Sequence, residues 1–195
     1  MLAAIPVKPF GVAKARLAGA LDARARSATG RAIAERTATL AAAAGAHVAI
    51  VTGDPGVARW AAALDHDVIG EGEHGHGLDG AALAATRYAA GRRLRWAIVH
   101  ADLPLVTADD LKAVFEAAPR AIAPSHDGGT NVITGSGSAF PFSYGPGSFH
   151  RHLAAAPDAV VISRPGLAHD LDTPADLRIA SSLQSGAWLA VVTSA

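Results

Sequence analysis

The chain has 195 residues, of which 50% are hydrophobic and 17% are charged, a composition that supports one folded domain and argues against intrinsic disorder. Its 17 basic residues balance its 17 acidic ones, so no net charge is available to attract nucleic acid or an anionic membrane. The absence of cysteine excludes disulfide bonds, thiolate metal sites and thiol nucleophiles. Because the sequence shows neither an export signal nor an apolar run of about 20 residues, we expect a cytoplasmic protein without a membrane partner.

Short apolar runs alternate with alanine-rich amphipathic stretches along the chain. The apolar runs predict strands at Leu2–Val7, His47–Thr52, Trp96–His100, Ala121–Pro124 and Ala159–Ser163. The amphipathic stretches predict helices at Asp22–Ala44, Val57–Leu64, Leu78–Arg92, Ala108–Ala117 and Pro174–Leu183. Strands without polar alternation are typical of a parallel sheet covered on both faces, so we expect an α/β sandwich. We assign residues 1–195 to a single domain and leave the tail 185–195 unassigned.

One stretch, Ser125–Gly147, interrupts this alternation. It is rich in glycine and contains no lysine or arginine. Its composition fits either a long surface loop or an irregular hairpin. Long loops in compact domains are often functional, and ligands of doubly wound sheets bind outside the carboxyl ends of the strands. We therefore look for the chemistry of this protein in the loops at that edge.

A basic loop follows the first predicted strand and carries Lys8, Lys14 and Arg16. Lysine can act as a point charge and arginine as a bidentate fork, so the loop is suited to a polyphosphate. The alternative is an ordinary solvated basic loop. A Walker motif is absent from the sequence.

Three acidic residues follow predicted strands or flank a predicted helix. Asp102 comes directly after an apolar strand, and Asp170 and Asp172 alternate with leucine, so that an extended backbone would turn both to one side. Carboxylates are the hard oxygen ligands that Mg²⁺ prefers, which makes these residues candidate metal ligands. The alternatives are a turn or helix-cap role for Asp102, and capping of the helix after residue 173 by Asp172 or Thr173.

The sequence Gly-Pro-Gly-Ser at residues 145–148 opens a predicted helix over 148–156. A helix N-terminus presents free N–H groups that suit a phosphate or carboxylate, and the alternative is that Ser148 simply caps the helix. We interpret His150 and His152 as solvated or packed side chains rather than ligands. The loops offer no convincing protein nucleophile, which agrees with metal-assisted attack on a nucleotide phosphate.

These motifs, taken in order, resemble the CofC/FbiD family of guanylyltransferases, which make the phosphodiester precursor of the deazaflavin coenzyme F-420. The resemblance covers residues 2–177 and rests on PVK, AKARLA, ADLPL, GTN, FSYGPGSF and DLDTP. It implies a Rossmann-like nucleotidyltransferase (GT-A-like) fold, a three-layer sandwich with a mostly parallel sheet. It also implies GTP and Mg²⁺, with phosphoenolpyruvate or 2-phospho-L-lactate as the acceptor.

The resemblance assigns roles to individual residues. It implies an acceptor site at Thr130, Gly145 and Ser148. It implies a metal site at Asp102, Asp170 and Asp172, and a site for the GTP phosphates at Lys8, Lys14 and Arg16. Asp102 and Lys14 are the residues that we expect to be catalytic.

The resemblance has one departure, at residues 77–81, where Gly-Leu-Asp-Gly-Ala stands in place of a GLNAA-like motif. Asp79 could read the N1–H and amino groups of guanine, or it could be an acid that complements the dipole at a helix N-terminus. Rival functions are a molybdenum-cofactor or sugar nucleotidyltransferase, whose Gly-rich first loop is replaced here by Lys8-Pro9-Phe10, and a non-catalytic nucleotide-binding module. The partners that we expect are GTP and a small phospho-acid, and a homodimer is left open.

Overall fold

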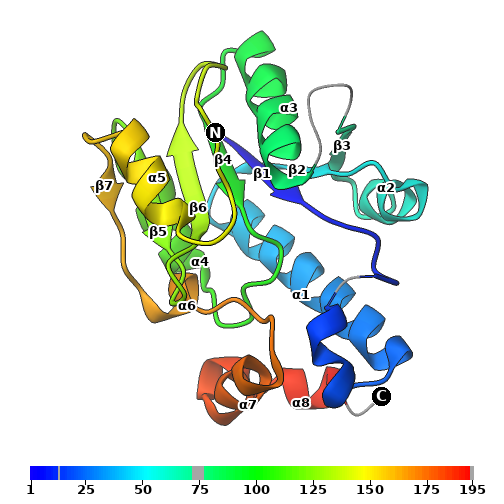
Figure 1. Ribbon diagram of the computed structural model, residues 1–195. Coiled ribbons are helices and arrows are strands. Elements are labelled where there is room, and N and C mark those ends of the chain that lie inside the picture. The colour runs from blue at the N-terminus through cyan, green and yellow to red at the C-terminus, as the bar shows by residue number, and fades with distance from the viewer. Residues whose placement is uncertain (13, 72–76, 194–195) are drawn as a thin grey trace.

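A seven-stranded sheet forms the centre of the computed structural model, which describes residues 1–12, 14–71 and 77–193 (Figure 1). The strands are β1 (Leu2–Pro6), β2 (His47–Val51), β3 (Asp67–Ile69), β4 (Trp96–Val99), β5 (Ala121–Pro124), β6 (Thr130–Gly135) and β7 (Val160–Val161). The α-helices are α1 (Ala23–Ala43), α2 (Pro55–Ala62), α3 (Gly77–Gly91), α4 (Ala108–Glu116), α5 (Ser148–Ala155), α6 (Pro165–Ala168), α7 (Pro174–Ser182) and α8 (Leu189–Thr193). Two short 3₁₀-helices are η1 (Ala15–Gly19) and η2 (Gln184–Gly186).

The strand order is β3-β2-β1-β4-β6-β5-β7, and most neighbouring pairs are parallel. β1 lies between β2 and β4, so that Leu2 is opposite both His47 and Trp96. Only β6 runs against its neighbours β4 and β5 within the described sheet. This topology confirms the predicted α/β fold with a mostly parallel sheet. It also means that the sheet is mixed, because the glycine-rich stretch contributes a strand.

Both interpretations of the stretch Ser125–Gly147 are confirmed, each for a different part: β5 and β6 form an irregular hairpin, and residues 136–147 form a loop that is mostly exposed or half-buried. Every residue of β6 is buried, and the register shifts between Ala123 and Pro124 on the partner strand. Sequence pattern could not show this strand because its buried polar groups find partners far along the chain. The Asn131 amide donates to the Leu167 carbonyl at 2.9 Å, and the Thr134 hydroxyl accepts the Ala121 N–H at 2.8 Å.

Helices cover both faces of the sheet, which confirms the three-layer sandwich. Side chains of α1, α2 and α4 share one hydrophobic core with the strands, and α3 packs into a second core on the opposite face. Most of the buried residues of α3 are alanines, so this helix can lie close to the sheet. Local caps fix where helices begin: Asp22 accepts the Ala25 N–H at 2.8 Å, and Asp54 accepts the Val57 N–H at 2.8 Å.

The tail that the sequence left unassigned forms η2 and α8, which contact α7 and α1. Figure 1 shows α7 and α8 below the sheet, beside the first turns of α1. The last two residues, 194–195, lie outside the described residues. In the part of the chain that the structure describes, no helix is both long and apolar enough to cross a bilayer.

Candidate active site

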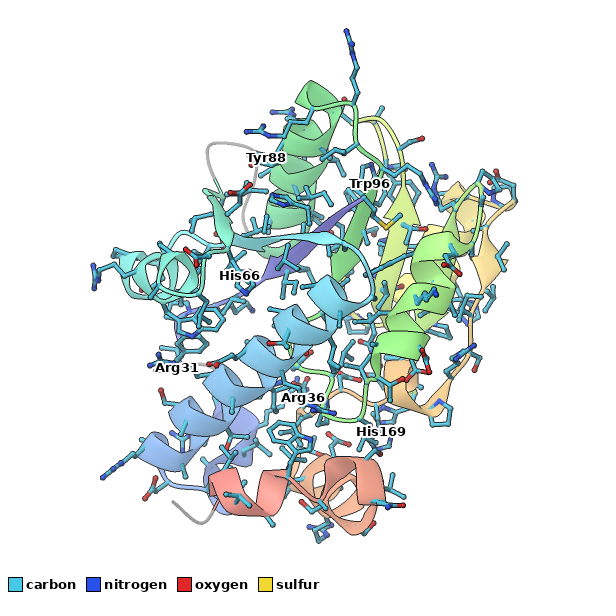
Figure 2. The ribbon with its side chains drawn as sticks, turned by 180° about the vertical axis from the view of Figure 1, so that it is seen from behind. Arg31, Arg36, His66, Tyr88, Trp96 and His169 are labelled. Atoms are coloured by element: carbon cyan, nitrogen blue, oxygen red, sulfur yellow. The ribbon has the colours of Figure 1, made fainter. Side chains whose placement is uncertain are left out.

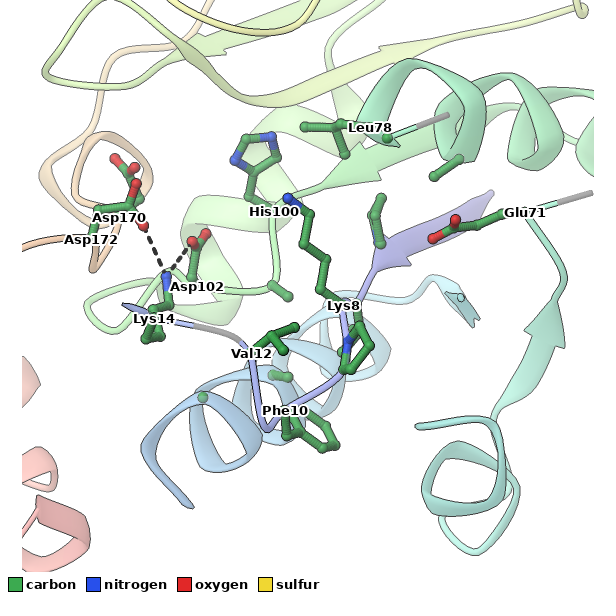
Figure 3. Close-up of a pocket in the computed structure, with 18 residues that line it drawn as sticks. Lys8, Phe10, Val12, Lys14, Glu71, Leu78, His100, Asp102, Asp170 and Asp172 are labelled. Atoms are coloured by element: carbon green, nitrogen blue, oxygen red, sulfur yellow. Dashed lines mark hydrogen bonds and ion pairs between the residues drawn. The ribbon is translucent and has the colours of Figure 1, made fainter. Parts of the chain in front are cut away.

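A cavity of about 590 Å³ opens at the carboxyl ends of β1 and β4 (Figure 3). Its walls come from the loop after β1, the start of α3, the segment after β4, and the segment that precedes α7. The lining side chains include Lys8, Lys14, His100, Asp102, Asp170 and Asp172. The cavity is therefore where a doubly wound sheet is expected to bind its ligand.

Lys14 joins two acids that are far away in the sequence. Its Nζ lies 2.5 Å from Asp102 Oδ2 and 3.2 Å from Asp172 Oδ1, across separations of 88 and 158 residues. Figure 3 shows both interactions as dashed lines. The Lys14 side chain is only 7% exposed, and its backbone is left-handed, with φ of 59°. A non-glycine residue adopts this conformation only where its surroundings hold it.

Opposite charges at this site stabilise the charged forms of Lys14 and Asp102. Burial by itself lowers the pKa of Lys14, but the charges and hydrogen bonds of Asp102 and Asp172 together raise it above its usual value. Burial also works to raise the pKa of Asp102, and the ammonium of Lys14 outweighs it, so that pKa is lowered. The pKa of Asp170 is raised by burial and by the neighbouring Asp102. Lys14 and Asp102 are thus a fully charged pair at neutral pH, on the acidic wall of the cavity.

The acids at the cavity suit a hard cation. Asp102 Oδ1 is buried and has no hydrogen-bond partner within residues 1–12, 14–71 and 77–193. Asp170 and Asp172 line the same cavity, and Asp170 Oδ1 accepts a hydrogen bond from the Asn131 amide at 3.4 Å. The described side chains nevertheless include no ready-made group of three metal-binding residues, and the Lys14 ammonium separates two of the three acids. The donor set fits Mg²⁺, while the three-acid metal site stays a prediction.

Helix capping explains the position of Asp176 and does not explain the positions of Asp102 and Asp172. Thr173 is the N-cap of α7, and the Asp176 side chain completes a capping box with it. The capping interpretation is therefore confirmed for Thr173 and wrong for Asp172, whose carboxylate contacts Lys14. It is also wrong for Asp102, because the next helix, α4, is capped by Thr107.

The three basic side chains of the predicted loop have different surroundings. Lys8 is exposed and lines the cavity, where it could meet a phosphate. Arg16 is 77% exposed and lies 3.9 Å from Asp172 Oδ2, outside the cavity lining. Lys14 is engaged with the acids. The phosphate-binding roles of all three residues remain predictions.

Thr130 and Ser148, two of the predicted acceptor residues, are neighbours in space, and each is 1% exposed. Their hydroxyl oxygens are 3.4 Å apart, and the His152 ring lies 3.0 Å from Thr130 Oγ1. The third residue, Gly145, is exposed and accepts the Ser148 N–H at 3.0 Å. The structure shows Ser148 as the first residue of α5, after an N-cap glycine at 147, so the interpretation of Ser148 as the cap is wrong.

His152 is packed in the core, as the sequence analysis expected, and the sequence did not reveal its contact with Thr130. His152 also accepts the Ser143 N–H at 3.0 Å, so it fastens residues 143–147, the glycine loop, to Thr130 of β6. Burial lowers the pKa of His152 to about 4, which keeps the ring neutral. Only the tertiary structure shows that the loop and the strand meet at this histidine.

Two further residues, neither assigned from the sequence, connect the cavity to this loop. His100 lines the cavity, and its ring centroid is 5.5 Å from that of Tyr144. Arg151 donates to the carbonyl groups of Ser143 and Pro146, at 2.9 and 2.7 Å, and so holds the loop in shape. A sequence signal existed for His100, which lies two residues before Asp102 at the end of β4.

Asp79 occupies the first turn of α3, which agrees with the dipole interpretation. Its Oδ1 accepts the backbone N–H of Tyr144 at 2.8 Å, so the carboxylate anchors the glycine loop to α3. Gly77 and Leu78, but not Asp79, line the cavity. Recognition of guanine by Asp79 stays a prediction.

The fold is shared with solved nucleotidyltransferases. A protein of Desulfovibrio desulfuricans G20, reported as a candidate nucleotide-diphospho-sugar transferase, matches with a TM-score of 0.74 and 18% identity, over 97% of this chain and 94% of that chain. The CMP:2-keto-3-deoxy-manno-octonic acid synthetase in complex with CTP matches with a TM-score of 0.55 and 14% identity, over 94% of this chain and 98% of that chain. At these identities the likeness shows the fold alone.

Similarity in sequence is more specific. A phosphoenolpyruvate guanylyltransferase of Rubrobacter xylanophilus is 36% identical, over 91% of this chain and 91% of its own length. One of Streptomyces coelicolor is also 36% identical, over 97% of this chain and 94% of its own length. The family model described as "Guanylyl transferase CofC like" matches residues 1–177, which include every acid of the cavity and the whole glycine loop. The chain belongs to the CofC-like family of guanylyltransferases.

Proposed function

We propose that this protein transfers GMP from GTP to the phosphate of phosphoenolpyruvate, giving enolpyruvyl-diphospho-guanosine and pyrophosphate, as a step toward coenzyme F-420. An oxygen of the acceptor phosphate forms a bond to the α-phosphorus of GTP, and the bond to the leaving pyrophosphate breaks. The observation that carries the proposal is the pair of carboxylates, Asp102 and Asp172, that contact the buried Lys14 in the lining of the strand-end cavity. The names of the relatives support the choice of acceptor.

The reaction needs no general base. A phosphate monoester has its second pKa near 6 and is mostly dianionic at neutral pH, so it is already a nucleophile. The protein must bring two polyanions together, which is a task for positioning and electrostatic stabilisation. Lys8 on the cavity wall and the ammonium of Lys14 provide positive charge where the triphosphate would lie.

Mg²⁺ would be held by Asp102, Asp170 and Asp172. When bound, it would neutralise charge on the transferring phosphates. Asp102 is suited to this role because one of its oxygens is buried without a partner among the residues described.

The acceptor would lie at the glycine loop, beyond His100. Thr130 and Ser148 are too buried to be its whole site, and they would act by fixing the loop that carries Gly145. Gly145 has a φ of 109°, and the nearest atom to a side chain built there is an Arg151 nitrogen at 3.9 Å. The exposed backbone at Gly145 is thus open to an anion, beside a guanidinium.

The test is to incubate the protein with GTP and Mg²⁺, adding phosphoenolpyruvate, 2-phospho-L-lactate or glucose 1-phosphate. Pyrophosphate is measured, and the second product is identified by mass spectrometry. We expect turnover with phosphoenolpyruvate and its loss in Asp102→Asn. Turnover on 2-phospho-L-lactate alone would change the acceptor, turnover on the sugar phosphate would favour the sugar nucleotidyltransferase rival, and binding of GTP without turnover on any of the three would favour the non-catalytic module. A cytoplasmic location and a homodimer stay predictions.

A further inference from the structure

Three charged segments of the active site meet over a small hydrophobic cluster, which the family model does not fully cover. The cluster consists of Leu17, Ile33, Leu105, Leu171, Ala180 and Leu189, all of them buried. Leu189 belongs to α8, which lies beyond residue 177, where the family match ends.

Three leucines of the cluster, Leu17, Leu105 and Leu171, belong to the segments that carry the charged side chains. The Leu17 N–H donates to the Lys14 carbonyl at 2.9 Å, and the Leu171 N–H donates to the Asp102 carbonyl at 3.0 Å. Leu171 stands between Asp170 and Asp172 in the sequence. A shift of this cluster would therefore move the backbone that carries both partners of the ion pair.

The C-terminal segment is fastened to the same place by specific contacts. Trp188 Nε1 donates to the Pro104 carbonyl at 3.2 Å, two residues after Asp102. A side chain at Gly186 would overlap the Ala180 carbonyl and come within 2.9 Å of Leu105 Cδ2, so this turn lies directly against the loop after Asp102. The guanidinium of Arg36, an α1 residue labelled in Figure 2, lies 5.3 Å from the centre of the Trp188 ring.

We propose that the segment Gln184–Thr193 is a positioning element of the active site, and that it acts through Trp188 and Leu189. It fixes the loop after Asp102 against the segment 170–172, so that both carboxylates converge on Lys14. None of its residues lines the cavity, so its role is to hold other residues in place. The inference rests on the proposed function only for the identity of the ligands.

The first test compares Trp188→Phe with Trp96→Phe. Each substitution keeps an aromatic ring and removes one indole hydrogen bond to a carbonyl, since Trp96 Nε1 donates to Gly137 at 2.7 Å in the core on the other face of the sheet. Binding of Mn²⁺ alone is measured by electron paramagnetic resonance, and kcat and KM are measured with GTP and phosphoenolpyruvate. Substitution of a residue that orients metal ligands typically changes metal affinity or activity by about 10- to 100-fold.

We expect Trp188→Phe to weaken Mn²⁺ binding and lower kcat by about tenfold, with KM for phosphoenolpyruvate within about twofold. Trp96→Phe should lower the Tm and leave Mn²⁺ binding and kcat unchanged. The proposal is overturned if Trp188→Phe lowers the Tm alone. If the wild-type protein does not make pyrophosphate, the proposed function fails, and the Mn²⁺ comparison still decides the positioning role.

A second pair of variants guards against a Trp188→Phe protein that does not fold. Leu189→Ala and Leu111→Ala each remove the same fully buried side chain, one from this cluster and one from the core under α4. Weaker Mn²⁺ binding in Leu189→Ala, at a Tm matched to that of Leu111→Ala, supports the proposal. Equal Mn²⁺ binding in the two variants contradicts it.

Discussion

Lys14 places one positive charge between the two acids Asp102 and Asp172, which would otherwise have no cation between them. Its side chain occupies the region between Asp102 and Asp172 where a metal ion would share their charge. Under the proposed function, Lys14 would oppose metal binding before the nucleotide arrives and would assist the reaction afterwards. This dual role separates Lys14 from Lys8, which lines the same cavity but has an exposed side chain.

Replacement of Lys14 by methionine tests this separation. Loss of the ammonium leaves Asp102 and Asp172 without their cation, so we expect Mn²⁺ alone to bind about tenfold more tightly, the size of one charge-assisted hydrogen bond. Turnover should fall, because the charge needed beside the phosphates is gone. Mn²⁺ titration and pyrophosphate release measure the two effects. Lys8→Met is the control and should leave Mn²⁺ binding unchanged; weaker Mn²⁺ binding in Lys14→Met would argue against the role of Lys14 as the cation between the two acids.

Asp172 is expected to be essential because it contributes a charge to the proposed metal site and contacts Lys14. Asp172→Asn keeps the shape of the side chain and removes its charge, and turnover should fall by orders of magnitude. Pyrophosphate release is measured as a function of Mg²⁺ concentration, with exposed Asp109→Asn as the control. A rate like that of the wild type at limiting Mg²⁺ would remove Asp172 from the metal site.

His152 links the stability of the protein to pH. Its pKa falls from 6.5 to about 4 on folding, mainly through burial, so below pH 6.5 the unfolded chain binds a proton that the folded chain does not. The contribution of His152 to the free energy of unfolding is therefore complete above about pH 6.5, and the free energy of unfolding falls by about 3 kcal/mol as the pH drops to 4. The check is urea unfolding between pH 4.5 and 7.5. In His152→Gln the free energy of unfolding should depend less on pH. In His150→Gln, which changes an exposed histidine of the same helix, the pH dependence should stay as in the wild type.

At the scale of elements, the glycine loop before α5 is held by contacts to α3 and α5. Asp79 of α3 accepts the Tyr144 N–H, and Arg151 of α5 binds the carbonyl groups of Ser143 and Pro146. The loop contains Gly145, to which we assign the acceptor, so its shape should determine how well the acceptor binds.

Two substitutions at Asp79 distinguish loop anchoring from guanine recognition. The amide oxygen of Asp79→Asn can still accept the Tyr144 N–H, so we expect a nearly unchanged KM for phosphoenolpyruvate and an unchanged preference for GTP over ATP. Asp79→Ala loses the hydrogen bond, and KM for phosphoenolpyruvate should rise about fivefold, equivalent to about 1 kcal/mol. Initial rates with both nucleotides provide the measurement. If Asp79→Asn lowers the preference for GTP, the residue reads guanine.

At the scale of the whole molecule, the cavity is built from segments at both ends of the chain, from the loop after β1 to Asp172. A ligand that binds there ties these segments together and stabilises only the folded state. GTP with Mg²⁺, at about 100 times its dissociation constant, should add about 2.7 kcal/mol to the free energy of unfolding. Thermal unfolding with GTP, ATP and no nucleotide measures the effect. Equal stabilisation by ATP would contradict selectivity for guanine.

Local sequence determined the parts of this protein that depend on neighbours along the chain. Apolar runs marked the main strands, alanine-rich periodicity marked the helices that cover them, and the Thr173 cap was visible beside its proline. The position of an acid at a strand end was enough to place Asp102 at the ligand edge of the sheet, because parallel strands all end on that side.

Tertiary structure decided whatever depends on partners distant in sequence. The strand β6 is polar by composition and buried in fact, because Asn131 and Thr134 find carbonyl and N–H partners on other elements. Lys14 was predicted for phosphates and is found between acids 88 and 158 residues away, a contact that no local pattern encodes. The tail offered no motif, yet Leu189 completes the cluster under the active site. Such contacts follow from how the layers pack. Burial stabilises any apolar surface that fits, and a buried polar group needs a partner, whatever the distance along the chain.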